Sequence, residues 1–495
     1  MKRWSVNFVG VLVNAAVVFS AAFAQEPGGS VSRVVRLNRA PVNKEVLKVR
    51  LPRPMETRLA NGLAVLVLER HKLPTVTFSL WVKTGALADP KDLPGLAHFT
   101  ADMLREGTAR RTSAQLAAEI DELGATLTAA ANFGASNTAV TVSGLVENAD
   151  QLLDLLGDVV LSPTFPSDEL EKYKTRQLAE IEEERSSPQF LAREEFFRAL
   201  YRSFPAAVVS AAPDSVKRVT TDELKKFHSQ YYVPGNAILG VAGDVTYDEI
   251  VGLIKKHLGD WKGRTVSPPD LSQLPPPAPA KIFLVDRPGS VQTNIVAGDY
   301  AVRRTDPDYI PLTVMNRVLG GGPSARLFLN LREEKSYTYG AYSRFNADTY
   351  AGAWYANTEV RNSVTDGAMH ELMYEFKRIR EQKVPETELD EARHSIVANF
   401  ALSLEQPAGL LNSWLTVKYY NLPEDYWDKY PEEVSKVTED AAQRAGKKYV
   451  DTDHLQIVCV GDGKQAGNKD GQPIKEVLKG YGPVEVFDTD GKRLE

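Results

Sequence analysis

The segment Ile238-Leu-Gly-Val-Ala-Gly-Asp244 has a counterpart 218 residues later, Gln456-Ile-Val-Cys-Val-Gly-Asp462, and this repetition decides the fold. Both segments are short apolar runs that end in Gly-Asp, a pattern typical of a strand followed by a turn. At the same offset, Val219–Tyr231 and Val437–Tyr449 precede them, and each predicts a helix. Several landmarks at one spacing indicate two copies of one domain.

A proline-rich stretch separates the two copies. Residues 266–280 contain six prolines in fifteen positions, which excludes a helix or a central strand and predicts an extended linker. We therefore expect an N-terminal domain at 51–265 and a C-terminal domain at 281–495. Each copy should open with a β-hairpin and then mix helices and strands without strict alternation. This pattern predicts an α+β fold, with helices packed on a mostly antiparallel sheet in each domain.

The first copy carries the clearest local signals. Its hairpin should turn at Asn61-Gly62, because Asn-Gly favours a tight turn between two strands. Ser113 is in position to cap the helix that follows it. The expected strands lie at 56–68 (the hairpin), 75–84, 125–143 and 237–242. The expected helices lie at 96–106, 113–123, 149–156, 167–185 and 222–231.

The N-terminus predicts export. Lys2 and Arg3 precede the apolar run Phe8–Phe23, and Ala22-Phe23-Ala24 resembles a cleavage signal. We expect a signal peptide at 1–24, a flexible leader at 25–50, and a periplasmic or secreted bacterial protein. The alternative is a membrane anchor, but the run is short for a span. No other segment predicts a membrane span.

Composition narrows the function classes. The formal net charge is −6 and no basic stripe stands out, so we expect no nucleic-acid partner. A chain of 495 residues can bury large cores without disulfides. Cys459 is the only cysteine, and its apolar neighbours predict an inert thiol in a buried strand.

Four motifs carry a family resemblance: Leu59-Ala-Asn-Gly-Leu63, Gly95-Leu-Ala-His-Phe99, Tyr231-Tyr-Val-Pro-Gly-Asn236 and Leu331-Arg-Glu333. With them, nearly the whole mature chain resembles the insulinase/pitrilysin family of zinc peptidases. The resemblance implies a fold of two homologous LuxS/insulinase-like domains. It also implies a His-x-x-Glu-His motif on the first helix, where residues four apart share a face and hold one zinc ion. The Glu acts as general base, and a later Glu is the third ligand.

In this chain the zinc motif is degenerate. His98 matches the first ligand, but Ala101 stands in place of the general base and Asp102 in place of the second His. Glu180 matches the third ligand. No two of the seven histidines lie within four residues, so a His pair on one helix is absent. We expect a hydrogen-bonded His98–Asp102 pair without metal. The alternative is a non-standard metal site of these three residues in a self-active hydrolase.

The resemblance also implies residues that act on substrate. In the family, an Arg and a Tyr of the second domain reach the zinc site of the first domain, and Arg332 and Tyr339 match them. The Arg fixes the substrate backbone, and the Tyr hydroxyl stabilises the oxyanion. Gly320-Gly-Gly322 is expected either beside substrate or as a plain helix C-cap. Thr128-Ala129 stands where the family often has Asn-Ala, on an edge strand that pairs with peptide.

These features predict the non-catalytic subunit of a heterodimeric zinc peptidase. A homologous partner with an intact motif would hold the zinc, and this chain would bind no cofactor. It would supply Arg332 and Tyr339 to the partner's active site, and it should be inactive alone. The expected substrates are short unfolded peptides, since a closed chamber excludes folded proteins. A silent scaffolding or binding subunit is the alternative, and a homodimer also stays open.

Overall fold

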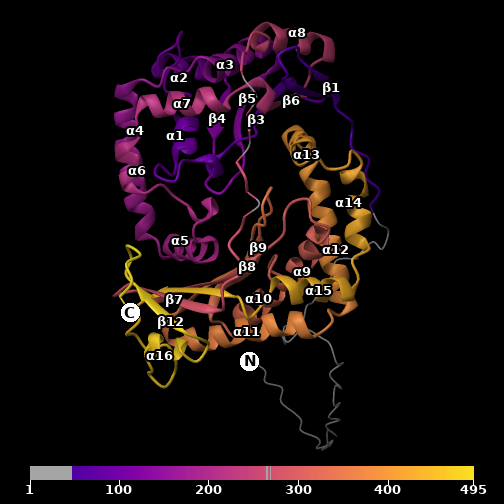
Figure 1. Cartoon of the computed structure of the whole chain (residues 1–495). Helices are drawn as coiled ribbons and strands as arrows, with labels where there is room; N and C mark the ends of the chain where they lie inside the picture. Colours follow the sequence, from indigo (N-terminus) through magenta and orange to yellow (C-terminus); the bar gives the residue numbers. More distant parts are fainter. Residues whose placement is uncertain (1–46, 264–265, 268, 272, 495) are drawn as a thin grey trace, which may run out of the picture.

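The computed structural model describes residues 47–263, 266–267, 269–271 and 273–494. The predicted signal peptide, 1–24, and the predicted leader up to residue 46 lie outside these residues. Two α+β halves are stacked on each other, with the first half at the top of Figure 1. Among the helices that the structure describes, none has the length and apolar character needed to span a membrane.

The first half contains a six-stranded sheet in the order β1-β2-β6-β3-β5-β4. Its strands are β1 (Met55–Arg58), β2 (Ala64–Glu69), β3 (Thr75–Val82), β4 (Thr126–Ala130), β5 (Thr138–Leu145) and β6 (Ala237–Gly243). Its helices are α1 (Leu96–Met103), α2 (Ser113–Glu122), α3 (Ala149–Leu161), α4 (Ser167–Ser186), α5 (Pro188–Tyr201), α6 (Pro213–Arg218), α7 (Thr221–Tyr231) and α8 (Tyr247–Leu258). The predicted hairpin is confirmed, since β1 pairs with β2 and Gly62 adopts a φ of +96° in the turn.

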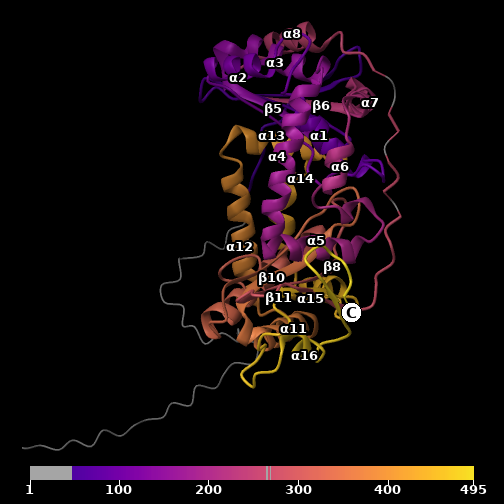
Figure 2. The same ribbon diagram turned by 90° about the vertical axis from the view of Figure 1, so that its left-hand side faces the viewer.

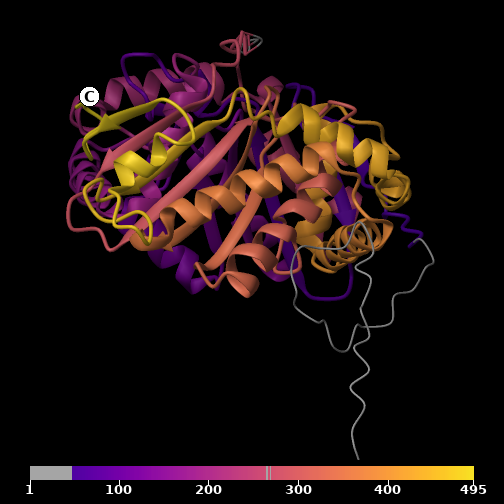
Figure 3. The ribbon, with the colours of Figure 1, turned by 90° about the horizontal axis from the view of Figure 1, so that it is seen from below.

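The second half contains a six-stranded sheet in the order β12-β7-β11-β8-β10-β9. Its strands are β7 (Lys281–Asp286), β8 (Gln292–Tyr300), β9 (Thr338–Phe345), β10 (Ala353–Arg361), β11 (Gln456–Gly461) and β12 (Val484–Phe487). Its helices are α9 (Tyr309–Leu319), α10 (Arg326–Phe328), α11 (Thr365–Glu381), α12 (Glu386–Ser403), α13 (Pro407–Tyr420), α14 (Tyr426–Ser435), α15 (Glu439–Tyr449) and α16 (Ile474–Leu478), with a π-helical turn, η5, at Leu329–Glu334. From below, α11 and α16 lie over the outer face of this sheet (Figure 3).

Short 3-10 turns join several of these elements. They are η1 (Ala86–Ala88), η2 (Val146–Asn148), η3 (Pro205–Ala207), η4 (Pro234–Asn236) and η6 (Asn362–Val364).

The two sheets share one strand order apart from one edge. In each sheet a parallel pair, β2–β6 or β7–β11, is followed by three antiparallel strands. At the edge, β1 pairs antiparallel in the first half, whereas β12 pairs parallel in the second. The expectation that a hairpin opens each copy is therefore wrong for the second copy. There the edge position is filled by a strand from the C-terminal end of the chain.

The expected helices at 96–106 and 149–156 end at Met103 and Leu161 instead, and α5, α6 and α8 were not predicted. The predicted cap of α2 is also wrong. Thr112, rather than Ser113, caps α2, because its hydroxyl accepts the Gln115 N–H while the Gln115 side chain accepts the Thr112 N–H. Ser113 is the first helical residue and donates to Glu106 instead. Cys459 is fully buried in β11 as predicted, and burial raises the pKa of its thiol to about 12.

Each half places one helix on the sheet of the other half. Helix α5 packs on β8 and β11, on the side of the second sheet that faces the first half, and α13 packs on β6 (Figures 1 and 2). A glycine makes room in each case. A Cβ atom on Gly240 would lie 2.7 Å from Leu411 Cδ1, and one on Gly298 would lie 2.8 Å from Phe196 Cζ. The halves are therefore joined by buried apolar contacts and not by the linker alone.

Polar loop contacts add to this joint. The hydroxyl of Tyr350, between β9 and β10, donates to the carbonyl of Gly134, between β4 and β5, at 2.8 Å. The same two loops meet at Asp348, which accepts hydrogen bonds from the backbone N–H and the hydroxyl of Ser136. The joint fixes the relative position of the residues that line the space between the two halves.

Candidate functional site

Helix α1 carries the degenerate zinc motif and is held firmly at its start. It follows Gly95, whose φ of +99° suits glycine, and the Asp89 carboxylate accepts N–H groups of Gly95 and Ala97 at 2.7 and 2.8 Å. Burial raises the pKa of Asp89 to about 7. The orientation of α1 is therefore fixed independently of any metal.

The His98–Asp102 pair differs in detail from the prediction. His98 Nε2 and Asp102 Oδ2 lie 3.4 Å apart, but the hydrogen bond to Asp102 comes from the Tyr173 hydroxyl at 2.8 Å. The His98 ring lies 5.0 Å from the ring of Phe133. Its Nδ1 is buried and has no hydrogen-bond partner among the residues that the structure describes. Ala101 is fully buried. No proton acceptor thus occupies the position of the general base.

Glu180 does not complete a metal site. It is exposed on α4, where it accepts a hydrogen bond from Gln177 at 2.9 Å. Within the described ranges, His98, Asp102 and Glu180 do not bring their ligand atoms within 4.8 Å of one another. The residues present therefore do not fit a zinc ion, which needs three or four converging ligands.

Arg332 and Tyr339 line one large cavity of about 1010 Å³ in the second half. Arg332 lies on η5, with its guanidinium 4.9 Å above the Phe328 ring and its side chain 44% exposed. Ser336 adopts a φ of +55°, which ends the π-helical turn and directs the chain into β9. Tyr339 is the second residue of β9 and is 91% exposed. The kink thus puts both side chains on one cavity wall.

The neighbouring tyrosines are less available. Tyr337 is partly buried and packs against the core of the second half. The Tyr342 ring lies 5.5 Å from the Phe328 ring. Tyr337 also lines the cavity, but of the three tyrosines only Tyr339 is largely exposed there.

The three glycines and the edge strand lie elsewhere. Gly320 is the C-cap of α9 and its carbonyl accepts the Ser343 N–H at 2.9 Å, while Gly321 and Gly322 pack on Arg317. None of the three lines the cavity of Arg332 and Tyr339. Their predicted substrate contact stays a prediction.

Strand β4 is a sheet edge, as expected. It pairs with β5 alone among the strands that the structure describes. Thr128 is exposed and Ala129 is buried, as the alternation of a half-buried strand requires. Arg105 already donates to the Leu127 carbonyl at 3.1 Å. The remaining edge is available for backbone pairing, and the roles of Thr128 and Ala129 stay predictions.

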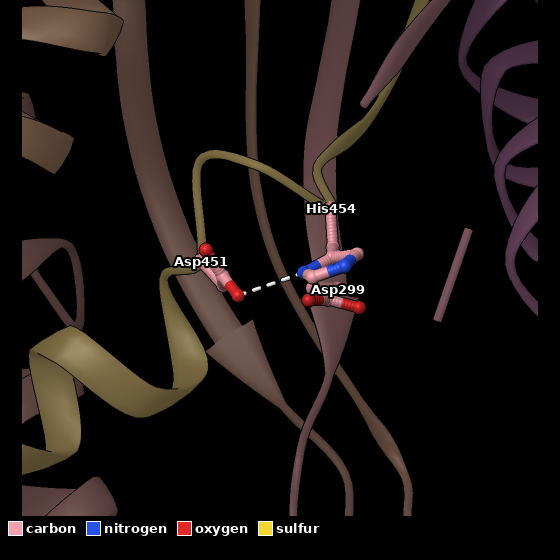
Figure 4. Close-up of side chains that lie close together, drawn as sticks. All are labelled: Asp299, Asp451 and His454. Atoms are coloured by element: carbon pink, nitrogen blue, oxygen red, sulfur yellow. Dashed lines mark hydrogen bonds and ion pairs between the residues drawn. The ribbon is translucent and has the colours of Figure 1, made fainter. Parts of the chain in front are cut away.

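Within the described part of the chain, three side chains of types that can bind a metal lie together, although the sequence gave no signal of this group. Asp299 at the end of β8 meets Asp451 and His454 from the loop before β11 (Figure 4). His454 Nδ1 lies 2.8 Å from Asp451 Oδ2, and this hydrogen bond raises the pKa of His454. Burial raises the pKa of Asp299 to about 7. Arg380 donates to Asp451 at 3.3 Å, so a protein cation already neutralises part of the charge.

Comparisons with known proteins agree with this fold. The model of the insulinase family (peptidase family M16) matches residues 64–214, and that of the peptidase M16 inactive domain matches 218–396. An uncharacterised zinc protease of Mycobacterium leprae is 28% identical over 364 residues, which cover 73% of this chain and 80% of that protein. One from Rickettsia felis is 27% identical over 356 residues, which cover 71% and 84%.

Solved structures show the same architecture. The crystal structure of a peptidase M16 inactive domain from Pseudomonas fluorescens has a TM-score of 0.76 and 26% identity, and covers 83% of this chain and 98% of that chain. A protease from Helicobacter pylori has a TM-score of 0.76 at 20% identity and covers 83% and 100%, which supports the fold alone. With the two-sheet fold and the matched models, the chain belongs to the insulinase family of peptidases, family M16.

Proposed function

We propose that this chain is the non-catalytic subunit of a heterodimeric zinc-dependent peptidase. A homologous partner with an intact His-x-x-Glu-His motif would hold the zinc and the general base. This chain would supply Arg332 and Tyr339, and short unfolded peptides would be the substrates. The mature subunit would act in the periplasm or outside the cell.

The exposure of Tyr339 is the observation that carries the proposal. A tyrosine side chain that is 91% exposed, on the wall of a cavity of about 1010 Å³, contacts little of its own chain. Its apolar ring gains stability only when another molecule covers it. A hydroxyl group in that position would donate to the oxyanion of a peptide that is held against a partner's zinc.

The guanidinium of Arg332 complements this role. Its planar fork of donors suits a peptide carbonyl or carboxylate. Among the described residues its single acidic partner is the adjacent Glu333. Its side chain is 44% exposed, so reorientation toward a ligand requires little desolvation. Among the described residues, His98, Asp102 and Glu180 do not form a zinc site. This supports the proposal that the partner holds the zinc, whereas this chain supplies only the groups that contact the substrate.

Reconstitution tests the proposal. The partner would be sought as a neighbouring gene that encodes a similar protein with the intact motif. We expect peptide cleavage by the mixture, inhibition by a chelator, and no cleavage by this chain alone. Chelator-sensitive cleavage by the isolated chain would contradict the proposal. An active partner that gains nothing from this chain would favour a scaffolding role instead.

A further inference from the structure

We propose that a second cleft, between the two halves, binds a carboxylate group of the peptide. The inference rests on the proposed function for the nature of the ligand, but its site is separate from Arg332 and Tyr339. The cleft has a volume of about 260 Å³. That is smaller than the roughly 300–1,000 Å³ typical of ligand pockets, and it suits one or two residues of a peptide.

Both halves build the walls of this cleft. Helix α5 contributes Arg193 and Phe197, and the second sheet contributes Arg344 and Tyr355. The loop after β4 contributes Phe133, which also contacts the ring of His98 on α1. The cleft therefore adjoins the degenerate zinc motif.

The charge of the cleft is one-sided. Arg193 and Arg344 line it, and of the residues that the structure describes no aspartate or glutamate does. In the part of the chain that the structure describes, neither arginine forms an ion pair. Arg344 has one long hydrogen bond, 3.5 Å, to the side chain of Asn357. A ligand carboxylate would give these two guanidinium groups the charged hydrogen-bond acceptor that they lack among the described residues.

Aromatic rings position these guanidinium groups. Arg193 Cζ lies 5.6 Å from the Phe190 ring and Arg344 Cζ lies 5.8 Å from the Tyr355 ring, both within cation–π range. The Phe197 ring on α5, the helix that carries Arg193, lies 6.0 Å from the Tyr355 ring on β10. Strand β10 pairs with β9, which carries Arg344. These apolar walls limit the access of water and so strengthen a charge-assisted hydrogen bond.

The cleft is preformed. Tyr350, which lines it, is 1% exposed and donates to the Gly134 carbonyl across the joint between the halves. A ligand therefore need not order these loops, and its binding energy is not spent on closing them. Two sources of the carboxylate share this chemistry, the free C-terminus of a peptide and an acidic side chain.

Fluorescence anisotropy with the full chain alone tests the site. The probes are three labelled decapeptides of otherwise neutral sequence: one with a free C-terminus, its C-terminal amide, and an amide with one internal Glu. We expect at least one carboxylate-bearing probe to bind about tenfold or more tightly than the neutral amide. Tighter binding of the peptide with a free C-terminus would identify the terminal carboxylate as the ligand. Tighter binding of the amide with an internal Glu would identify an acidic side chain.

Matched variants assign the effect. Arg193→Gln and Arg344→Gln should each reduce the preference for carboxylate, and the double variant should abolish it. Arg444→Gln, an exposed arginine on α15, should keep it. Equal binding of all three probes, no binding of any, or a preference that survives in the double variant would overturn the inference. Because this assay needs neither partner nor zinc, failure of the reconstituted peptidase would leave its result standing.

Discussion

The Tyr173 hydroxyl donates a hydrogen bond of 2.8 Å to the Asp102 carboxylate, at the position where family members carry a second zinc-binding His. Burial raises the pKa of Tyr173, with a further contribution from the Asp102 charge. The phenol therefore stays protonated and keeps donating. Together with the buried methyl group of Ala101, this contact converts a metal-binding helix face into an ordinary polar contact between α1 and α4.

The contact between Tyr173 and Asp102 leads to a prediction about the zinc content of the purified chain. After equilibration with zinc and desalting, we expect the purified chain to retain far less than one zinc ion per molecule, because Glu180 lies outside the His98–Asp102 group. Inductively coupled plasma mass spectrometry gives the ratio. One zinc ion per chain that disappears in a His98→Ala variant would show that the degenerate motif still binds metal.

The glycine under α13 gives a stability prediction. Gly240→Ala should lower the free energy of unfolding by about 1–3 kcal/mol, because the new methyl group would press on Leu411 and Leu415. Gly252→Ala, in an open part of α8, should instead raise it by roughly 0.5–1 kcal/mol. Urea unfolding of the two variants compares one substitution in two environments. Equal effects would argue against tight packing of α13 on the first sheet.

The joint between the loops is testable by hydrogen exchange. Asp348→Ala removes an acceptor that serves the N–H and the hydroxyl of Ser136. We expect a loss of about 1–3 kcal/mol in stability and faster amide exchange in both residues 131–137 and 346–352. Asp366→Ala, in which Tyr481 loses the side-chain acceptor but keeps the backbone carbonyl of residue 366, is the control within the second half. Faster exchange in only one loop would mean that Asp348 does not join the halves.

Asp299 predicts a pH dependence of stability. Its folded-state pKa is about 7, whereas an unfolded aspartate titrates near 3.8, so the folded chain binds the extra proton between these values. Stability from this group is therefore full at low pH and falls as pH rises from about 4 through 7. His454, with a raised pKa, acts in the same direction. Asp299→Asn should raise the melting temperature more at pH 8 than at pH 5.

Differential scanning fluorimetry at the two pH values measures this effect. Asp453→Asn, an exposed neighbour in the same loop, serves as the control and should change little at either pH. An Asp299→Asn variant that is destabilised equally at both pH values would show that the ionised carboxylate is tolerated in its buried position.

The sequence was sufficient for elements that depend on local patterns. The Asn61-Gly62 hairpin, the buried strand of Cys459 and the repeated strand–helix spacing all follow from periodicity and turn chemistry. The cap of α2 was misplaced by one residue, because Thr112 and Ser113 have equivalent side chains and only the backbone conformation distinguishes them.

Features that need long-range contacts were not predictable. The parallel edge strand β12, the exchange of α5 and α13, and the Asp299–His454 group join residues far apart in the chain. Likewise, periodicity does not distinguish the exposed Tyr339 from Tyr337, because their environments depend on the kink at Ser336. The pair Arg332 and Tyr339 came from a family resemblance, and the structure adds their shared cavity.

The turnover number of the reconstituted pair with Tyr339→Phe in this chain tests the central claim most directly. We predict a decrease of about 100-fold or more in kcat with little change in KM, since the lost hydroxyl acts on the developing oxyanion. Tyr374→Phe, an exposed tyrosine on α11, should leave kcat unchanged. A Tyr339→Phe pair with the kcat of the wild type would contradict the account.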